Sequence, residues 1–230
     1  MIPTPPPPLT GTPIASRAAA EVVDSLQLAL LVAYLQSSLY TRALAVAGFV
    51  TTADLIVVGA LNTQESSHVA ALTTLITTRG SAAPTQPTFD FTAKGALPGF
   101  AFADGQYETF RMLAQAFEDL SVRAYKGQLQ ALVEDKPALN AALAIHAVEA
   151  RHAAEVRRLR GKKGWITGSS REDLPAFAQA IYDGEELTSQ GGFDVSSAVA
   201  SFGGVDAASQ AFDEPLTTAE VTAIITPFIA

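Results

Sequence analysis

Long stretches of apolar residues at helical spacing fill the first two thirds of the 230-residue chain and predict four helices. The first is expected over Ser16–Ala47, apolar around most of its circumference and ended by Gly48. The other three are expected over Thr52–Arg79, Asp104–Glu134 and Asp135–Gly161, each beginning at a residue type that can cap a helix. Helices of about 25 to 30 residues make rods of roughly 40 Å, the length that four-helix bundles use.

The segments between and after these helices are rich in proline and glycine. Ser81–Ala103 is too long for an ordinary turn between two helices and predicts a crossover along the bundle. After Gly161, short helical segments are expected at 173–182, 196–201 and 217–226, with a turn at Gly191-Gly192, all packed outside the bundle. Six of the 13 prolines lie in the first 13 residues. We therefore expect a flexible proline-rich arm at 1–15, a bundle at 16–161 and a C-terminal appendage at 162–230.

The pattern Glu-x-x-His occurs twice, at Glu65/His68 and Glu149/His152, each time inside a predicted helix. Residues three apart share one face of a helix, so the carboxylate and the imidazole can both turn toward one inward-facing ion. Bundles that hold two iron or manganese ions complete this set with one glutamate from each of the other two helices. Glu118 is the candidate from the third helix.

The two halves of the bundle repeat with an offset of about 85 residues. Tyr40 lies 25 residues before the first Glu-x-x-His motif, and Tyr125 lies 24 residues before the second. The position equivalent to Glu118 is then occupied by Ala33, whose methyl group cannot bind a metal. The sequence thus supplies five of six expected protein ligands, namely Glu65, His68, Glu118, Glu149 and His152.

Two polar residues could rebuild the missing ligand. Gln36 lies one turn after Ala33 on the same face, and His146 lies one turn before the second motif. Both are poorer ligands for a hard metal than a carboxylate, and His146 is expected to lie beside the ligands or in the core. The hydroxyls of Tyr40 and Tyr125 are expected to reach a buried carboxylate.

The nature of the bound group follows from these side chains. Three carboxylates and two imidazoles suit iron or manganese, with zinc as an alternative, and the gap at Ala33 favours one ion over two. A second interpretation has no metal. The buried histidines would then form hydrogen bonds with the glutamates, because buried charges must be paired.

Composition restricts the partners. The formal net charge of −8 disfavours non-specific binding to nucleic acid or to anionic lipid, and the basic run Arg157–Lys163 is expected to stabilise a helix end. The apolar stretch Ser25–Thr41 is interrupted by polar residues and is too short to span a membrane.

Thiol ligands and disulfides are excluded because the chain has no cysteine. Without a visible signal peptide, either export with a removed leader or a cytoplasmic location stays open.

With these motifs in place, the chain resembles the ferritin-like proteins, and most closely the bacterial and plant desiccation-related family. The runs PTQPTFDF at Pro84–Phe91 and FDEPLTTAEVTAIITPFI at Phe212–Ile229 are also similar to that family. The resemblance implies an all-α fold, an antiparallel four-helix bundle with one long crossover. The family's first helix resembles Glu-Tyr-Leu-Glu where this chain has Ala33-Tyr34-Leu35-Gln36, so both carboxylates of that motif are absent.

The resemblance also implies a function. We expect a modified, incomplete carboxylate and histidine site that binds one transition metal, with an oxidase or peroxide-handling role in stress protection. The alternative is a non-enzymatic scaffold or desiccation-protective protein with a degenerate site. The assembly is expected to be a monomer or homodimer, not a 24-subunit cage.

Overall fold

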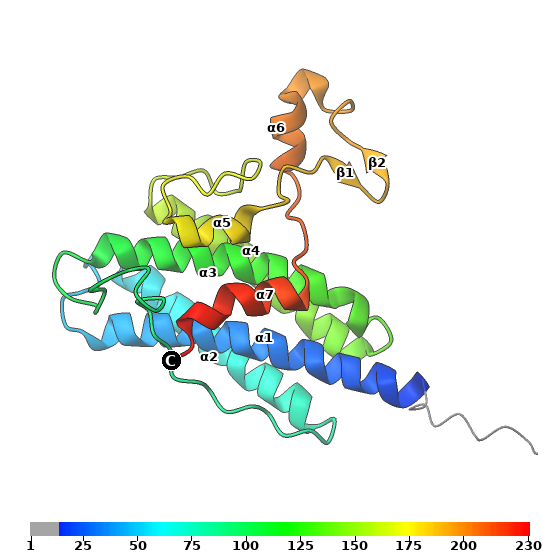
Figure 1. Cartoon of the computed structure of the whole chain (residues 1–230), viewed down its shortest axis with the longest axis horizontal. Helices are drawn as coiled ribbons and strands as arrows, with labels where there is room; N and C mark the ends of the chain where they lie inside the picture. Colours follow the sequence, from blue (N-terminus) through cyan, green and yellow to red (C-terminus); the bar gives the residue numbers. More distant parts are fainter. Residues whose placement is uncertain (1–13) are drawn as a thin grey trace, which may run out of the picture.

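Four long helices form the bundle, as the apolar pattern predicts (Figure 1). The computed structural model describes residues 14–230, and side chains from residue 19 onward, so the predicted arm at 1–15 lies almost entirely outside the described residues. The helices are α1 (Ile14–Ala45), α2 (Leu55–Thr77), α3 (Tyr107–Gln128) and α4 (Lys136–Leu159).

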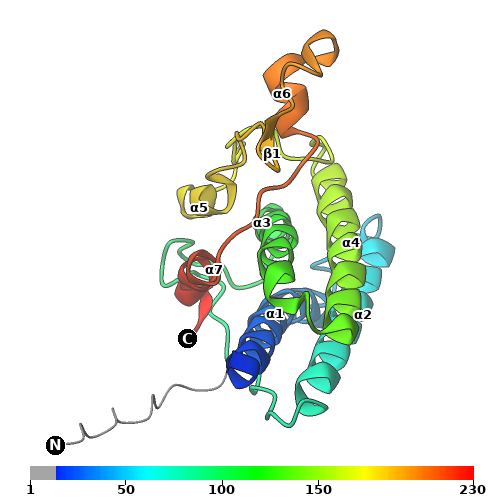
Figure 2. The ribbon, with the colours of Figure 1, turned by 90° about the vertical axis from the view of Figure 1, so that its right-hand side faces the viewer.

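The helices pair as two antiparallel hairpins, α1 with α2 and α3 with α4, and α1 packs against α3 (Figure 2). The segment between α2 and α3 is the predicted long crossover. It lies along α1, where the Tyr34 hydroxyl donates to the Pro84 carbonyl and Arg42 donates to the Phe89 carbonyl. These bonds satisfy backbone groups of a segment that has almost no regular structure of its own.

The predicted caps at Thr52 and Asp104 are wrong. Helix α2 begins only after Asp54, whose carboxylate accepts from the Tyr107 hydroxyl at 2.8 Å. Helix α3 begins after Gln106, because the Gln106 amide bonds three backbone groups of the preceding loop and holds the chain in a turn. Both helices begin later than predicted because of side-chain contacts that capping preferences do not take into account.

The cap of α4 is confirmed, since the Asp135 carboxylate accepts from the Ala138 amide at 3.0 Å. Asp135 also pairs with Arg79 at the end of α2, which joins the two motif-bearing helices at one end of the bundle. A cap and an interhelical ion pair are thus combined in one carboxylate.

The C-terminal region adds short elements around the bundle. These are α5 (Gln179–Tyr182), β1 (Ser189–Gln190), β2 (Phe193–Asp194), α6 (Gly204–Ser209) and α7 (Thr218–Ile225), with 3-10 turns at Leu129–Leu132, Ala176–Ala178, Ala200–Phe202 and Thr226–Phe228. Helices α5 and α7 pack on the outside of the bundle, while the β1–β2 hairpin and α6 project away from it (Figure 1). The predicted Gly191-Gly192 turn is confirmed. The helix expected at 196–201 is wrong, because the chain forms turns there and becomes α-helical only at 204.

Two buried arginines attach this region to the bundle. Arg157 of α4 forms a two-pronged ion pair with Asp119 of α3, and Asp119 also accepts from the Tyr182 hydroxyl at 2.6 Å. Arg123 of α3 donates to backbone carbonyls of the C-terminal region and pairs with Glu185 at 2.7 Å. Arg157 therefore forms a buried ion pair. The sequence had suggested only that its positive charge stabilises the end of a helix.

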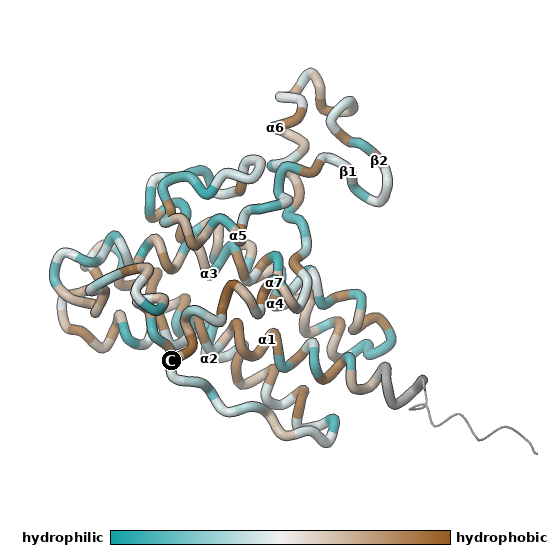
Figure 3. Tube along the Cα trace, viewed as in Figure 1, coloured by the Kyte–Doolittle hydropathy of each residue, from teal (hydrophilic) through white to brown (hydrophobic). Residues whose placement is uncertain are grey.

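Helix α1 is the central helix, and its inner positions are fully buried. By length and composition Ala19–Ala45 could cross a membrane, and within the described part of the chain it is the one helix that could. The bundle accounts for its apolar character, since 61% of its most apolar window is buried in the protein. The hydropathy trace shows apolar residues recurring along the helices of the bundle (Figure 3).

Candidate metal centre

The two Glu-x-x-His motifs converge in one buried polar layer of the bundle. On α2, this layer lies between the apolar contacts of Leu61 and Leu72, and on α4 it lies between those of Ile145 and Val156. The carboxylates of this layer are fully buried, and its two imidazoles are nearly so. The structure brings together all five residues that the sequence singles out, which are Glu65, His68, Glu118, Glu149 and His152.

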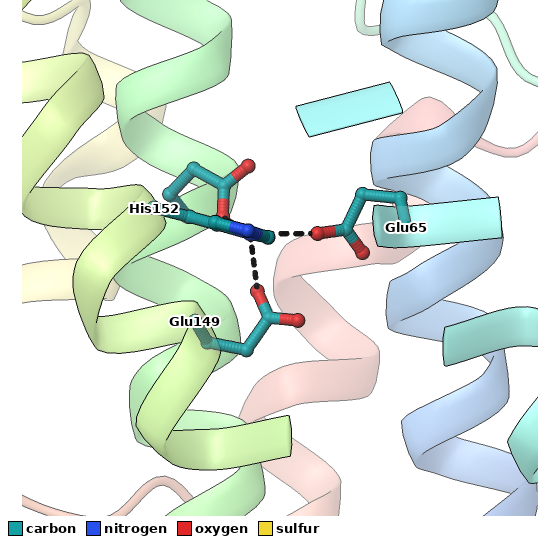
Figure 4. A group of neighbouring side chains, drawn as sticks. Glu65, Glu149 and His152 are labelled. Carbon is teal, nitrogen blue, oxygen red and sulfur yellow. Dashed lines mark ion pairs between the residues drawn. The ribbon is translucent and has the colours of Figure 1, made fainter. Parts of the chain in front are cut away.

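Four of these side chains can reach a common point. Glu65, Glu118, Glu149 and His152 each offer one ligand atom, and these atoms all lie within 4.8 Å of one another. The Nδ1 atom of His152 is 2.9 Å from Glu65 Oε1, 3.6 Å from Glu118 Oε2 and 3.9 Å from Glu149 Oε2. Figure 4 shows the imidazole of α4 between the carboxylates of Glu65 and Glu149. A set of oxygens and one imidazole nitrogen suits a divalent transition metal.

The orientation of His152 favours metal binding. Its Nε2 lies 2.8 Å from the Gln64 amide oxygen, which can only accept, so Nε2 donates and Nδ1 faces the carboxylates. Although Nδ1 is close to Glu65, the two atoms are not aligned for a hydrogen bond. Within residues 19–230, His152 Nδ1, Glu65 Oε1 and Glu149 Oε1 have no aligned hydrogen-bond partner. Buried polar atoms without partners are costly, and a shared cation would satisfy all three.

His68 lies on the other side of this group. Its Nδ1 is 2.8 Å from Glu149 Oε1 and 3.3 Å from Glu65 Oε2, and its ring stacks on that of His152 at 5.9 Å. It is not one of the four residues whose ligand atoms converge. His68 thus bridges the two motif glutamates from the side of the bundle where Ala33 replaces a glutamate.

The pKa values show how the cluster balances its charge with protons. Burial alone would lower the pKa of both histidines, but the carboxylates of the glutamates beside each imidazole outweigh it and raise the pKa of His68 to about 9 and of His152 to about 10. Burial and the neighbouring carboxylates raise the pKa of Glu118 to about 8. Burial would also raise the pKa of Glu149, but His68 and His152 hold it below its usual range. Three clustered carboxylates need positive charge, which protons or a metal ion can supply.

A family model described as ferritin-like domain matches residues 21–162, well over half of the chain. The chain belongs to the ferritin-like family. No curated protein matches the sequence. The matched range runs from α1 to just beyond α4, so it contains the whole polar layer of this ferritin-like bundle.

On the α1 and α3 side, the ferritin-like bundle surrounds the carboxylates with hydrogen-bond donors. Gln36 Nε2 donates to Glu118 at 2.8 Å and to Glu149 at 2.9 Å, and the Ser121 hydroxyl donates to Glu149 at 2.7 Å. The Tyr40 hydroxyl donates to Glu118, as expected. Gln36 therefore orients two carboxylates through its amide nitrogen, and its buried Oε1 has no hydrogen-bond partner within residues 19–230.

The gap at Ala33 is visible in the ferritin-like core. Ala33 packs in an apolar cluster that includes Tyr125. By the repeat, Tyr125 should donate to residue 33 as Tyr40 donates to Glu118. Instead, the buried Tyr125 hydroxyl has no hydrogen-bond partner within residues 19–230. The expectation that it reaches a carboxylate is wrong, because the carboxylate that would accept is absent.

Sequence reasoning missed two residues of this layer. Ser121 follows Gln36 by 85 residues, so the repeat offset could have identified it. Gln64 gave no signal, because its contact with His152 depends on how α2 and α4 face each other. His146 is half-buried, burial lowers its pKa, and no contact joins it to the cluster in the described part of the chain.

Proposed function

We propose that this ferritin-like protein binds one divalent iron or manganese ion through Glu118, His152, Glu65 and Glu149. The observation that supports this best is the convergence of buried ligand atoms, several of which lack a hydrogen-bond partner. Three carboxylates and one imidazole form a hard ligand set, which iron and manganese prefer, and zinc is the alternative ion. The proposed site belongs to a bundle domain at 16–161, with 162–230 as its appendage.

The same repeat argues for one ion in this proposal. A second ion would lie between His68, Glu65 and Glu149 and would need a glutamate at position 33, where the chain has Ala33. In its place, His68 donates toward the two motif glutamates. The residues on the α1–α2 side thus neutralise the carboxylates without supplying a complete ligand set.

We further propose a role in stress protection through oxidase or peroxide-handling chemistry. A bound iron or manganese ion supplies the redox chemistry for such a reaction. The chain's own contribution is to hold the carboxylates through Gln36, Ser121 and Tyr40, and to keep water out with the fully buried layer. The resemblance of the sequence to the desiccation-related branch supports this role.

The competing proposal is a metal-free scaffold, protective through its surface. It is favoured by one observation, which is that both histidines already lie close enough to glutamates for ion pairing without a metal. The two proposals differ in what the protein contains when it is purified.

Metal analysis with calorimetric titration of iron or manganese distinguishes them. The metal proposal predicts about one ion per chain, lost in His152→Ala and retained in the matched control His146→Ala, whose histidine lies outside the cluster. Absence of binding in the wild-type chain, or equal binding by His152→Ala, would favour the scaffold. Circular dichroism of each variant shows whether the bundle is intact.

A further inference from the structure

A hollow of about 300 Å³ lies where the C-terminal region packs on the bundle. Its walls are α5 with the turn before it and α7 with the turn after it, and both helices contact α3 and each other (Figure 2). The lining is mainly apolar and includes Phe177, Leu216, Ile224, Pro227 and Phe228. This volume is at the low end of the range for small-molecule sites, so the hollow suits a compact ligand.

Contacts with the bundle hold both walls of this hollow in place. Arg123 of α3 donates to the Asp183 carbonyl directly after α5 at 3.1 Å, and the Arg123 carbonyl accepts from the Leu216 amide before α7 at 3.1 Å. The rings of Phe177 and Phe228 pack edge to face across the two walls, with their centroids 5.5 Å apart. The hollow is therefore formed before any ligand binds, which keeps the cost of ordering its walls low.

Two acidic residues also line the hollow, Asp183 on the α5 side and Glu220 on α7, and both are exposed. Hydrogen bonds from Thr217 lower the pKa of Glu220, so this carboxylate is ionised at neutral pH. Within the part of the chain that the structure describes, neither carboxylate forms an ion pair, because Arg123 is paired with Glu185 at 2.7 Å. The site thus combines an apolar lining with two carboxylates that have no cationic partner.

The charge of the surrounding chain determines which ligands this hollow can accept. Residues 172–230 contain ten acidic residues and no basic ones. An anionic ligand would be repelled there, and a neutral ligand would gain nothing from the two carboxylates. A ligand with an apolar body and one positive charge is complementary to both parts of the site. The thin stem of a lysine side chain would leave part of the hollow empty, so an amine with a bulkier body fits better.

We propose that the hollow between α5 and α7 binds a small organic cation, which is an amine with an aromatic or branched apolar body. The apolar body lies among the side chains of Phe177, Ile224 and Phe228, and the ammonium group lies between the carboxylates of Asp183 and Glu220. This site lies outside the bundle and shares no residue with the proposed metal centre, so it does not depend on whether a metal binds.

Titration of the full chain with phenethylammonium, followed by ligand-detected NMR, tests this proposal. Phenethyl alcohol and phenylpropionate have a similar shape but are neutral and anionic, respectively. The cation should bind about five- to tenfold more tightly than the alcohol, as expected for two exposed ion pairs, and the anion should bind more weakly than the alcohol. Added salt should reduce the difference between the cation and the alcohol, because it screens exposed charges.

Variants of the lining separate the roles of shape and charge. Ala223→Phe on α7 should fill the hollow and weaken binding of the cation by about tenfold or more. Ala219→Phe is the matched control, because Ala219 is exposed on the same helix but does not line the hollow. The double variant Asp183→Asn with Glu220→Gln should abolish the preference for the cation over the alcohol. A glutamine at position 220 can still close the capping box of α7.

Equal affinities for the cation, the alcohol and the anion would overturn the proposal, as would equal effects of the two phenylalanine variants. Failure of phenethylammonium to bind up to its solubility limit would overturn it too. Tighter binding of Nα-acetyllysine amide than of phenethylammonium would contradict a free amine as the occupant and would indicate the side chain of a partner protein. Circular dichroism of each variant verifies that the fold is intact.

Discussion

The α1–α2 and α3–α4 hairpins repeat each other in sequence but differ in what they offer a metal ion. The second hairpin has Glu118 and His152, with Tyr40 donating to Glu118. The first has Ala33 and His68, and the hydroxyl of Tyr125 has no acceptor within residues 19–230. In the proposed site, one residue therefore separates a complete half-site from an incomplete one.

The outer surfaces of the hairpins differ as well. The α3–α4 hairpin is joined to the C-terminal region through Asp119, which pairs with Arg157 and accepts from the Tyr182 hydroxyl, and through Arg123. The α1–α2 hairpin has an uncharged outer face on α2. The α3–α4 hairpin thus supplies the more complete half of the proposed metal site and carries the C-terminal region, whereas the outer side of α2 stays uncovered by other helices of the described chain.

The largest expected effect comes from restoring the repeat. Ala33→Glu should raise metal content from about one ion per chain to about two, because the new carboxylate completes the half-site of His68 and accepts from Tyr125. Metal analysis after saturation and dialysis measures this. Ala33→Gln, of similar size without a charge, is the control and should stay near one ion. Unchanged content in a folded Ala33→Glu protein would disprove the assumed register.

The attachment of the second hairpin can be broken separately. Asp119→Ala leaves Arg157 buried without its partner and should lower the free energy of unfolding by about 3–5 kcal/mol. Urea denaturation measures the loss. Glu155→Ala, which removes the partner of the exposed Arg158, is the matched control and should cost under about 1 kcal/mol. Similar losses in the two variants would show that the buried pair is not what holds the region.

The pH dependence of stability and of metal affinity tests the same difference between the two half-sites. In the metal-free protein the raised pKa values of His68 and His152, about 9 and about 10, add stability that is fully present below pH 6.5 and is lost as pH rises through those values. A metal must displace the proton of His152, so its affinity should rise about tenfold per pH unit for each proton displaced, up to a pH of about 10, where the imidazole is already neutral.

Calorimetry in buffers of different ionisation enthalpy counts the displaced protons. Ala33→Glu should release more protons per chain than wild type, because His68 then also binds a metal. A metal affinity that is independent of pH between 6.5 and 9 would rule out imidazole ligation.

The smallest effects come from the paired tyrosines. Tyr40→Phe removes a donor to the buried Glu118 and should destabilise the metal-free protein by about 1.5–3 kcal/mol. Tyr125→Phe removes a buried hydroxyl without a partner, so it should be neutral or stabilise the fold by about 1 kcal/mol. Thermal unfolding compares the two. Equal destabilisation would mean that Tyr125 has a partner equivalent to that of Tyr40.

Sequence alone determined the four helices, the inward position of both Glu-x-x-His motifs and the absence of a carboxylate at residue 33. These features depend on local periodicity, because residues three or four apart share a helix face whatever the rest of the fold does. The repeat offset aligned Tyr40 with Tyr125 and Glu118 with Ala33, and the structure then showed that the Tyr40 hydroxyl donates to Glu118. Membership of the ferritin-like family agrees with this local evidence.

Tertiary structure alone decided how distant residues meet. It showed Gln36 as a donor to two carboxylates, Gln64 as the partner of His152, and Arg157 as a buried ion-pair partner of Asp119. It also placed the starts of α2 and α3 later than capping residues suggested and left the outer face of α2 uncovered. Most of these features depend on contacts across dozens of residues, and the start of α3 depends on a side-chain turn formed by Gln106. Helical periodicity says which face is inward but not which neighbour it meets.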